Sequence, residues 1–253
     1  MSLTTNTQVT SFKKIMDYDE LYIALSYVST GKQRREQSQE DSRDKQVIPI
    51  VLPCKSGRNL DIVRIFVALE LSSDICQNLA RVQALLRSLS DKSRLTYVDP
   101  ELMHITVKFI GEVSVHRLPS IISALQSVTF SPFLITAGQV GADNCKRPQT
   151  IWSCISDSSY GQKLQTAVDK ALTPLGIAPE KRRFMAHTTI ARVKHAEASL
   201  KSVLQNSASI NVNTSYGSCI ISGMKLKKST LTAHGPIYED VWAVRWPSVN
   251  ATA

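Results

Sequence analysis

Residues 104–107 read His-Ile-Thr-Val, and residues 187–190 read His-Thr-Thr-Ile. Both tetrads follow the pattern His, any residue, Thr and a β-branched aliphatic residue, and both lie in runs that are typical of strands, 103–110 and 185–193. Alternate side chains of a strand lie on the same face. Each tetrad therefore places its imidazole and its Thr hydroxyl together, and two such strands side by side would line one cleft with two His and two Thr.

Two facing imidazoles suit acid–base chemistry near neutral pH, because one can accept a proton while the other donates one. Thr hydroxyls suit the binding of phosphate oxygens. A single His-x-Thr in a strand usually marks a partly buried structural His, but a repeat in matching apolar settings at half-domain spacing favours a functional pair. The other three His, His116, His195 and His234, lie in polar or turn-like sequence, and we interpret them as surface residues.

The composition is typical of a globular protein, with 253 residues of which 43% are hydrophobic. No apolar run approaches the ~18 residues that a membrane helix needs, and the N-terminus lacks the layout of a secretory signal. The five Cys are scattered, odd in number and never paired as CxxC, which argues against a disulfide framework and a zinc site. We therefore expect a cytoplasmic protein without a metal, a cofactor or a membrane partner.

The net charge is +9, and nearly all of the positive excess lies after residue 63. A domain this basic favours polyanions as partners, although solubilising surface charge is the alternative explanation. Because basic residues cluster near the second tetrad, we expect RNA or a nucleotide as the partner.

The chain divides into an extension and a domain. In the N-terminal extension, residues 1–63, the spacing of apolar residues over 13–29 is compatible with one short amphipathic helix. Residues 30–48 carry too few large apolar groups to offset the entropy of ordering, so we predict that the extension is largely disordered. Residues 64–248 form the domain.

Helices and strands alternate along the domain, and each half holds a helix and a tetrad strand. This order predicts an α+β fold with two pseudo-symmetric lobes, each an antiparallel sheet with helices outside, and a central cleft that carries both HxT motifs. We expect Gly111 to end the first tetrad strand. The predicted helices are 74–89, 118–126, 160–175 and 197–205, and the predicted strands are 64–69, 94–98, 103–110, 133–140, 150–156, 185–193, 215–226, 229–233 and 241–246.

Four runs resemble a known family: RIFVALELSSDI from residue 64, YVDPELMHITVKFIGEV from 97, RRFMAHTTIARV from 182 and SGMKLKKSTLTAHGPIYEDV from 222. Over about residues 64–247 the chain resembles the two-histidine (2H) phosphoesterases, specifically the LigT-like RNA 2′,3′-cyclic phosphodiesterases, also called 2′-5′ RNA ligases. That family often has Pro where this chain has Ala186, and Trp where it has Tyr97. Neither departure removes a group that handles protons.

The resemblance implies metal-independent hydrolysis of RNA 2′,3′-cyclic phosphate ends to 2′-phosphomonoesters. By analogy His187 is the proton acceptor that activates water, and His104 is the proton donor to the departing ribose oxygen. Thr106 and Thr189 would donate hydrogen bonds to the phosphate oxygens. The family also places an Arg near the phosphate, at the position of Arg192. On a regular strand this residue would face away from His187, so the strand must end or twist first.

Basic and aromatic residues near the tetrads are candidates for RNA contacts. We expect Lys181, Arg183 and their basic neighbours to contact the RNA backbone in a salt-dependent way, together with Lys225, Lys227 and Lys228. Tyr97 or Phe184 would stack on a terminal base, with core packing as the alternative for Phe184.

Three alternatives stay open. One is 2′-5′ joining of RNA ends, the reverse sense of the same chemistry, and another is cleavage of 2′-5′-linked oligonucleotides. The third is a non-catalytic module that binds RNA ends, which two intact tetrads disfavour. The expected partner is an RNA with a cyclic phosphate end, for example a tRNA fragment, and the family suggests a monomer.

Overall fold

The computed structural model describes residues 46–49, 62–90, 92–206, 208, 210–211, 215–232 and 235–246, with residues 46–49 described as backbone only. The fold below is that of the described residues within the unit Arg43–Ala253. The helix predicted over 13–29 lies outside the described residues. The boundary at residue 64 stays a prediction, although β1 (Gln46–Pro49) pairs with the C-terminal strand of the sheet.

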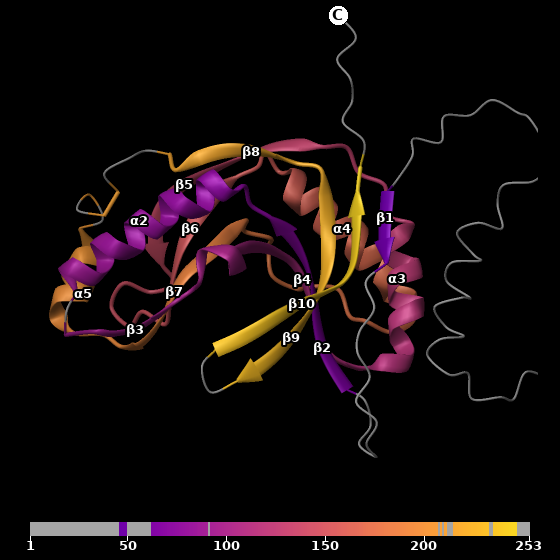
Figure 1. Cartoon of the computed structure of the whole chain (residues 1–253), viewed down its shortest axis with the longest axis horizontal. Helices are drawn as coiled ribbons and strands as arrows, with labels where there is room; N and C mark the ends of the chain where they lie inside the picture. The colour runs from indigo at the N-terminus through magenta and orange to yellow at the C-terminus, as the bar shows by residue number, and fades with distance from the viewer. Residues whose placement is uncertain are drawn as a thin grey trace, which may run out of the picture. The chain divides into compact units, whose positions relative to one another are not determined.

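The predicted α+β class is confirmed: helices pack on a curled sheet whose strand pairs are all antiparallel (Figure 1). The sheet order is β1-β10-β9-β2-β4-β7-β6-β5-β8, and β3 pairs with β7. The further strands are β2 (Ile62–Glu70), β3 (Arg94–Tyr97), β4 (His104–Ser114), β5 (Phe133–Ala142), β6 (Thr150–Ser156), β7 (His187–His195), β8 (Gly217–Ile221), β9 (Gly223–Thr232) and β10 (Gly235–Arg245). The helices are α2 (Ser73–Leu89), α3 (Leu118–Gln126), α4 (Tyr160–Leu172) and α5 (Ala198–Gln205).

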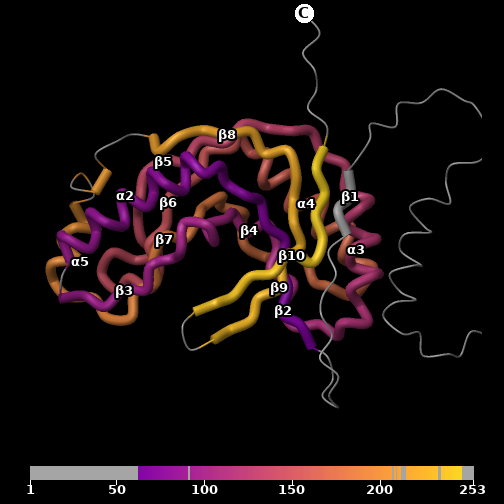
Figure 2. The backbone as a smooth tube through the Cα atoms, in the orientation of Figure 1, coloured from indigo at the N-terminus to yellow at the C-terminus, as the bar shows by residue number. Residues whose placement is uncertain are grey.

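The sheet has two halves of like design, β10-β9-β2-β4 and β7-β6-β5-β8, which meet where β4 pairs with β7. Each half has the order strand, helix and tetrad strand along the chain: β2, α2 and β4 in one, with β3 between α2 and β4, and β6, α4 and β7 in the other. The helices cross over, because α2 contacts β7 and β8 while α4 contacts β4. Figure 2 shows the same path as a continuous tube, with the two tetrad strands at the centre.

Local sequence signals explain the helix ends. The Ser72 hydroxyl accepts a hydrogen bond from the Ile75 backbone N–H and so caps α2. The buried face of α2 carries Ile75, Leu79, Val82 and Leu86, which are spaced by three or four residues. Helix α4 ends at Leu172, earlier than predicted, and a 3₁₀ turn leads to Gly176, whose φ of 74° closes the segment.

Several predicted strand limits are wrong. The strand predicted at 229–233 is part of β9, and β10 begins at Gly235 instead of 241. Gly111 does not end β4, because it adopts a φ of 91° inside the strand, where the register with β2 shifts, and the strand continues to Ser114. The segment 215–226 is not one strand: it divides at Ser222 into β8 and β9. The division has a tertiary cause, since β8 pairs with β5 at one end of the sheet order, whereas β9 pairs with β2 and β10 in the other half.

One apolar cluster joins both halves and includes Ile65, Leu79, Ile105, Ile151 and Trp242. Burial of this cluster is the main stabilising contribution to the fold. Among the helices of the described residues, none is long and apolar enough to span a bilayer.

Candidate active site

The two tetrads meet at the junction of the halves. Ile105 of β4 and Thr188 of β7 are directly opposite each other in an antiparallel pair. This register places His104 beside Thr189 and Thr106 beside His187, so all four side chains share one face of the sheet. We call this surface the histidine face.

Both imidazoles are held in the same way. Nδ1 of His104 lies 2.7 Å from the Leu102 carbonyl oxygen, and Nδ1 of His187 lies 2.7 Å from the Met185 carbonyl oxygen. A carbonyl oxygen can only accept, so each Nδ1 carries the hydrogen and donates it. Nε2 of each ring is then the nitrogen left for chemistry, as an acceptor in the neutral ring or a donor in the charged one.

A tight turn positions the Leu102 carbonyl. The Asp99 side chain accepts a hydrogen bond from the Glu101 backbone N–H, and Pro100 begins a single 3₁₀ turn that ends at Leu102. The chain therefore enters β4 with this carbonyl beside the imidazole of His104.

The surroundings of the two rings differ. The His104 ring is half-buried, with its centroid 5.0 Å from that of Phe66 and 5.3 Å, edge-on, from that of Tyr238. His187 is exposed, and its nearest aromatic partner is Trp152, at 6.0 Å between centroids. Burial lowers the pKa of the His104 imidazole below its ordinary value of 6.5.

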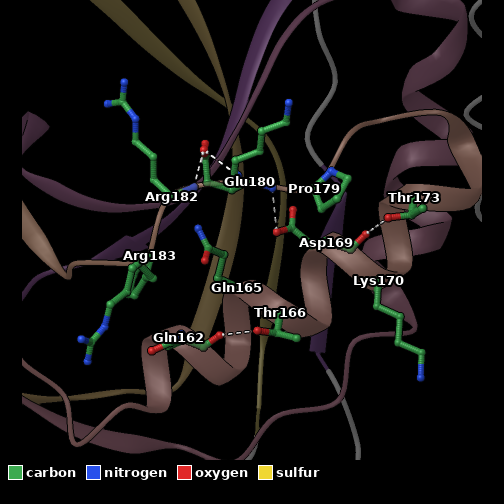
Figure 3. A pocket seen from close by; sticks show the side chains of 12 residues that line it. Gln162, Gln165, Thr166, Asp169, Lys170, Thr173, Pro179, Glu180, Arg182 and Arg183 are labelled. Carbon is green, nitrogen blue, oxygen red and sulfur yellow. Dashed lines mark hydrogen bonds between the residues drawn. The ribbon is translucent and has the colours of Figure 1, made fainter.

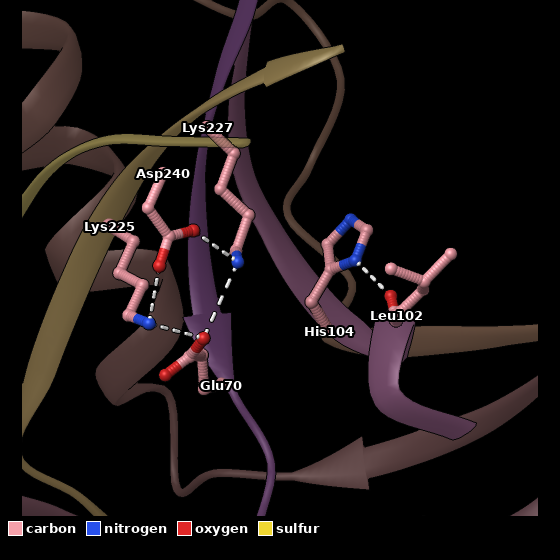
Figure 4. A network of polar contacts seen from close by, with 6 residues as sticks. All are labelled: Glu70, Leu102, His104, Lys225, Lys227 and Asp240. Atoms are coloured by element: carbon pink, nitrogen blue, oxygen red, sulfur yellow. Dashed lines mark hydrogen bonds and ion pairs between the residues drawn. The ribbon is translucent and has the colours of Figure 1, made fainter. Parts of the chain in front are cut away.

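Charges around His104 act in both directions. Lys227 and His187 lower its pKa further, whereas the hydrogen bond to Leu102 and the charge of Glu70 raise it. Lys227 belongs to a network that Figure 4 shows beside the ring. In this network Asp240 accepts hydrogen bonds of 2.6 Å from both Lys225 and Lys227, and Glu70 lies 2.7 Å from Lys225 and 3.4 Å from Lys227.

A β-bulge turns Arg192 toward the histidine face. On the side of β6, Thr189 pairs with Trp152 and Ala191 with Ile151, so Ile190 is an extra residue in β7. Ile190 and Ala191 are consecutive buried residues, and the next residue, Arg192, is exposed. Beyond the bulge the alternation of faces is reversed. This bulge therefore supplies the change of direction that β7 needs if Arg192 is to lie on the same face as His187.

Charge effects at Tyr238 agree with this position of Arg192. Burial raises the pKa of the Tyr238 hydroxyl, and the positive charges of Arg192 and Arg64 oppose the rise. Because Tyr238 touches the His104 ring, Arg192 reaches the surroundings of the first imidazole from the opposite half.

Strand β4 has a matching bulge. Thr106 pairs with Ala68 and Lys108 with Val67, so Val107, the fourth residue of the first tetrad, is extra. The residue that corresponds to Arg192 is Phe109, which is exposed, and the Arg64 guanidinium lies 4.7 Å from the centre of its ring. The two halves thus share a backbone design but carry different side chains at this position.

The Thr residues on the histidine face are partly exposed. In the part of the chain that the structure describes, neither the Thr106 nor the Thr189 hydroxyl hydrogen-bonds to another residue. Both hydroxyls are therefore available to a ligand.

Tyr97 and Phe184, the two residues that the sequence predicted to stack on a base, both pack against the core. Tyr97 pairs with the buried Ala191, packs against the core and lies under the Arg87 guanidinium, 4.0 Å from the ring centre. Its neighbour Thr96 pairs with Arg192, so Tyr97 points to the other face of the sheet. Phe184 is partly buried and packs against the core, which agrees with the alternative that the sequence offered for it.

Lys181 and Arg183 lie on the wall of a cavity of about 620 Å³ between α4 and the loop that precedes β7. Both residues are exposed. Figure 3 shows the side chains of Arg182 and Arg183 on the same side of the view. Neither imidazole lines this cavity, so Lys181 and Arg183 belong to a different surface from the histidine face.

The sequence did not single out Phe66, Trp152 or Tyr238, although they are the aromatic rings that touch the imidazoles. Tyr238 had one available signal, because it lies in the last of the four runs that carry the family resemblance. Within the described ranges, no three His, Cys, Asp or Glu side chains gather so that they could hold a metal ion.

Comparisons with known proteins agree with these features. The family model described as LigT like Phosphoesterase matches residues 69–152. The chain is 34% identical over 180 residues to an RNA 2′,3′-cyclic phosphodiesterase of Archaeoglobus fulgidus, a match that covers 71% of this chain and 98% of the relative. It is 30% identical over 191 residues to the protein of the same name from Methanothermobacter thermautotrophicus, covering 72% and 98% of the two chains.

Solved structures share the fold. A crystal structure of a Thermus thermophilus protein superposes with a TM-score of 0.60 at 19% identity, covering 74% of this chain and 99% of the other. The crystal structure of E. coli LigT complexed with 3′-AMP gives a TM-score of 0.57 at 17% identity, covering 74% and 99%. The two relatives, which are 34% and 30% identical to this chain over nearly their whole length, show that the chain belongs to the LigT-like phosphoesterase family.

Proposed function

We propose that the protein hydrolyses the 2′,3′-cyclic phosphate at the end of an RNA to a 2′-phosphomonoester, without a metal ion, by acid–base catalysis with His104 and His187. The observation that carries the proposal is the pair of imidazoles on one face. In each, Nδ1 is bound to a carbonyl, and Nε2 has no hydrogen-bond partner in the described part of the chain. The names of the archaeal relatives support the cyclic phosphate as the substrate.

In the proposed reaction a water oxygen attacks phosphorus while Nε2 of one imidazole takes a proton from that water. The bond between phosphorus and O3′ breaks, and Nε2 of the other, protonated imidazole gives its proton to O3′. The product keeps the phosphate on O2′. The two rings exchange their protonation states during the reaction, and proton exchange with solvent restores them.

The phosphate oxygens gain charge in the transition state, and donors placed before the reaction stabilise it. Thr106 and Thr189 offer two hydroxyls, one beside each imidazole, that have no hydrogen-bond partner among the residues that the structure describes. Arg192 adds a positive charge on the same face. These three residues are the proposed phosphate-binding set.

The family resemblance favours His104 as the proton donor and His187 as the acceptor. Burial of His104 disfavours its charged form in the free protein. A bound phosphodiester anion would counteract this effect, because a nearby negative charge raises the pKa of an imidazole. We therefore retain His104 as the donor and expect its protonation to be coupled to substrate binding.

Contacts with the rest of the RNA are proposed for Lys181 and Arg183, which are exposed in the loop that precedes β7. Lys225, Lys227 and Lys228 are less suitable than the sequence suggested, because each is ion-paired with an acidic residue. Tyr97 is not proposed as a stacking residue, since its ring lies under Arg87. A cytoplasmic location and a monomeric state stay predictions.

The decisive experiment is analysis of the RNA end. A short RNA with a 2′,3′-cyclic phosphate is incubated with the full chain in EDTA and, separately, with added Mg²⁺. After digestion, the terminal nucleotide is compared by chromatography with nucleoside 2′-phosphate and 3′-phosphate standards. We expect the 2′-phosphate at equal rates in both solutions.

An unchanged cyclic end would overturn the proposal, and so would equal turnover by a protein that carries both His104→Ala and His187→Ala. Binding of the RNA without turnover would favour the non-catalytic module. Formation of a longer strand when an RNA with a 5′-hydroxyl is added would favour ligation.

A further inference from the structure

The carbonyl of the bulge residue Ile190 accepts two hydrogen bonds, one of 3.0 Å from the Val98 backbone N–H and one from a side chain of α2. Nε2 of Gln83 donates one hydrogen bond of 2.8 Å to the Ile190 carbonyl and another of 2.7 Å to the Val98 carbonyl. Gln83 is only 3% exposed. A buried amide is costly unless it is hydrogen-bonded, and both N–H groups of Gln83 have partners.

The other half repeats this contact. Nε2 of Gln165, on α4, lies 3.4 Å from the Val107 carbonyl oxygen. Val107 and Ile190 are the fourth residues of the two tetrads and the extra residues of the two bulges. Each half therefore uses a helix glutamine to bind the carbonyl of its bulge.

The consequences of the two contacts differ. The bulge at Ile190 decides the face on which Arg192 lies, and Arg192 is a proposed phosphate ligand. The bulge at Val107 decides the face of Phe109, which carries no charge. Only the contact of Gln83 is thus coupled to phosphate binding.

We propose that Gln83 is a positioning residue: by holding the Ile190 carbonyl, it keeps β7 bulged and Arg192 turned toward the phosphate site. The inference rests on the proposed function, because it assigns Gln83 a role through Arg192. Gln83 itself lies behind the sheet, in the buried face of α2, and does not touch the substrate.

A double-mutant cycle tests the coupling. Gln83→Met keeps the length of the side chain and removes both donors, and Arg192→Gln removes the charge. Two quantities are measured for each variant: kcat/KM for adenosine 2′,3′-cyclic phosphate, and the affinity for adenosine 2′-phosphate by titration calorimetry. We expect Gln83→Met to lower both by about 10-fold in the natural background and by less than about 2-fold in the Arg192→Gln background, because coupled sites are not additive.

The matched control is Gln165→Met. Since Phe109 carries no charge, this variant should change both quantities by less than about 2-fold in either background. If Gln83→Met lowered kcat/KM and the affinity by the same factor in both backgrounds, the inference would be overturned, because a purely structural contact has the same effect with and without Arg192. A crystal structure of the Gln83→Met protein with an unchanged bulge at Ile190 and Arg192 still beside Tyr238 would overturn it as well.

The outcomes separate the inference from the proposed function. If the protein binds adenosine 2′-phosphate but hydrolyses no cyclic phosphate, the function fails and the affinity cycle alone decides the role of Gln83. If Gln83→Met does not fold, Gln83→Glu replaces it, because a carboxylate of the same size cannot donate to both carbonyls. The criterion of non-additivity with Arg192 is the same for that variant.

Discussion

The tetrad strands β4 and β7 have nearly the same backbone and different surroundings. In both, the His Nδ1 binds the carbonyl two residues earlier at 2.7 Å, and the fourth residue of the tetrad forms a bulge that a helix glutamine contacts. His104, however, is half-buried between Phe66 and Tyr238, whereas His187 is exposed. Five residues after the His, β4 carries Phe109 and β7 carries Arg192.

The comparison teaches that a symmetric backbone can support an asymmetric reaction. The proposed hydrolysis needs one imidazole that accepts and one that donates a proton, and identical surroundings would give both rings the same preference. Burial and neighbouring charges make the difference, because they move the pKa of His104 while the backbone geometry of the two rings is alike.

Removal of either imidazole should have the largest effect. We expect His104→Ala and His187→Ala each to lower kcat/KM for a cyclic-phosphate nucleotide by roughly 10³-fold. The double variant should be little worse than either single one, because the two rings act as a unit. His195→Ala is the matched control, since His195 is exposed and pairs with Glu197 away from the tetrad residues, and it should keep nearly full activity. If the loss of kcat/KM in the double variant equalled the product of the two single losses, the two imidazoles would not act as a unit.

Loss of the charge at Arg192 should be the next largest effect. Arg192→Gln is expected to lower kcat/KM by about 10²-fold, the usual cost of removing a donor to a developing oxyanion. Arg64→Gln tests the equivalent region of the other half, where the guanidinium lies over Phe109, and should cost less than about 10-fold. The kcat/KM of both variants is measured by steady-state kinetics with adenosine 2′,3′-cyclic phosphate. Equal losses of kcat/KM in the two variants would show that the difference between Arg192 and Phe109 has no role in the reaction.

The pH dependence of kcat/KM shows which role His104 has. Its pKa in the free protein is lowered from 6.5, and kcat/KM reports the free enzyme. If His104 is the proton donor, kcat/KM falls as the pH rises through that lowered pKa, because the ring loses the proton it must give. The corresponding fall of kcat should occur at higher pH, because the bound anionic phosphate raises the pKa of His104. A rise of kcat/KM through that pKa would instead make His104 the acceptor.

The smallest expected effect concerns the network beside His104. Lys227→Met removes a positive charge that lowers the pKa of His104 and leaves the negative charges of Glu70 and Asp240 less balanced. The pKa of His104, measured by NMR titration of the imidazole, should therefore rise. Lys228→Met is the matched control, because Lys228 pairs with Glu239 and should leave the His104 titration unchanged. A lower pKa in the Lys227→Met protein would contradict this electrostatic account.

Much of the fold could be predicted because local signals agreed with it. Helix α3 has the predicted limits, and α2 differs from its prediction by one residue at its start, since Pro119 and the cap at Ser72 mark their first turns. The division of 215–226 into β8 and β9 could not be predicted from the run of strand-forming residues alone. Only their pairing with different ends of the sheet separates them.

The sequence by itself determined the two His-x-Thr tetrads, the strands that carry them and the polyanionic class of partner, because alternation, repetition and charge are local or additive properties. The tertiary structure decided the face of Arg192, the aromatic surroundings of His104 and the contacts of the lysines in β9. These features depend on bulges and on pairs of strands far apart in the chain. A single inserted residue reverses every later side chain of a strand, and local sequence patterns do not mark where that insertion occurs.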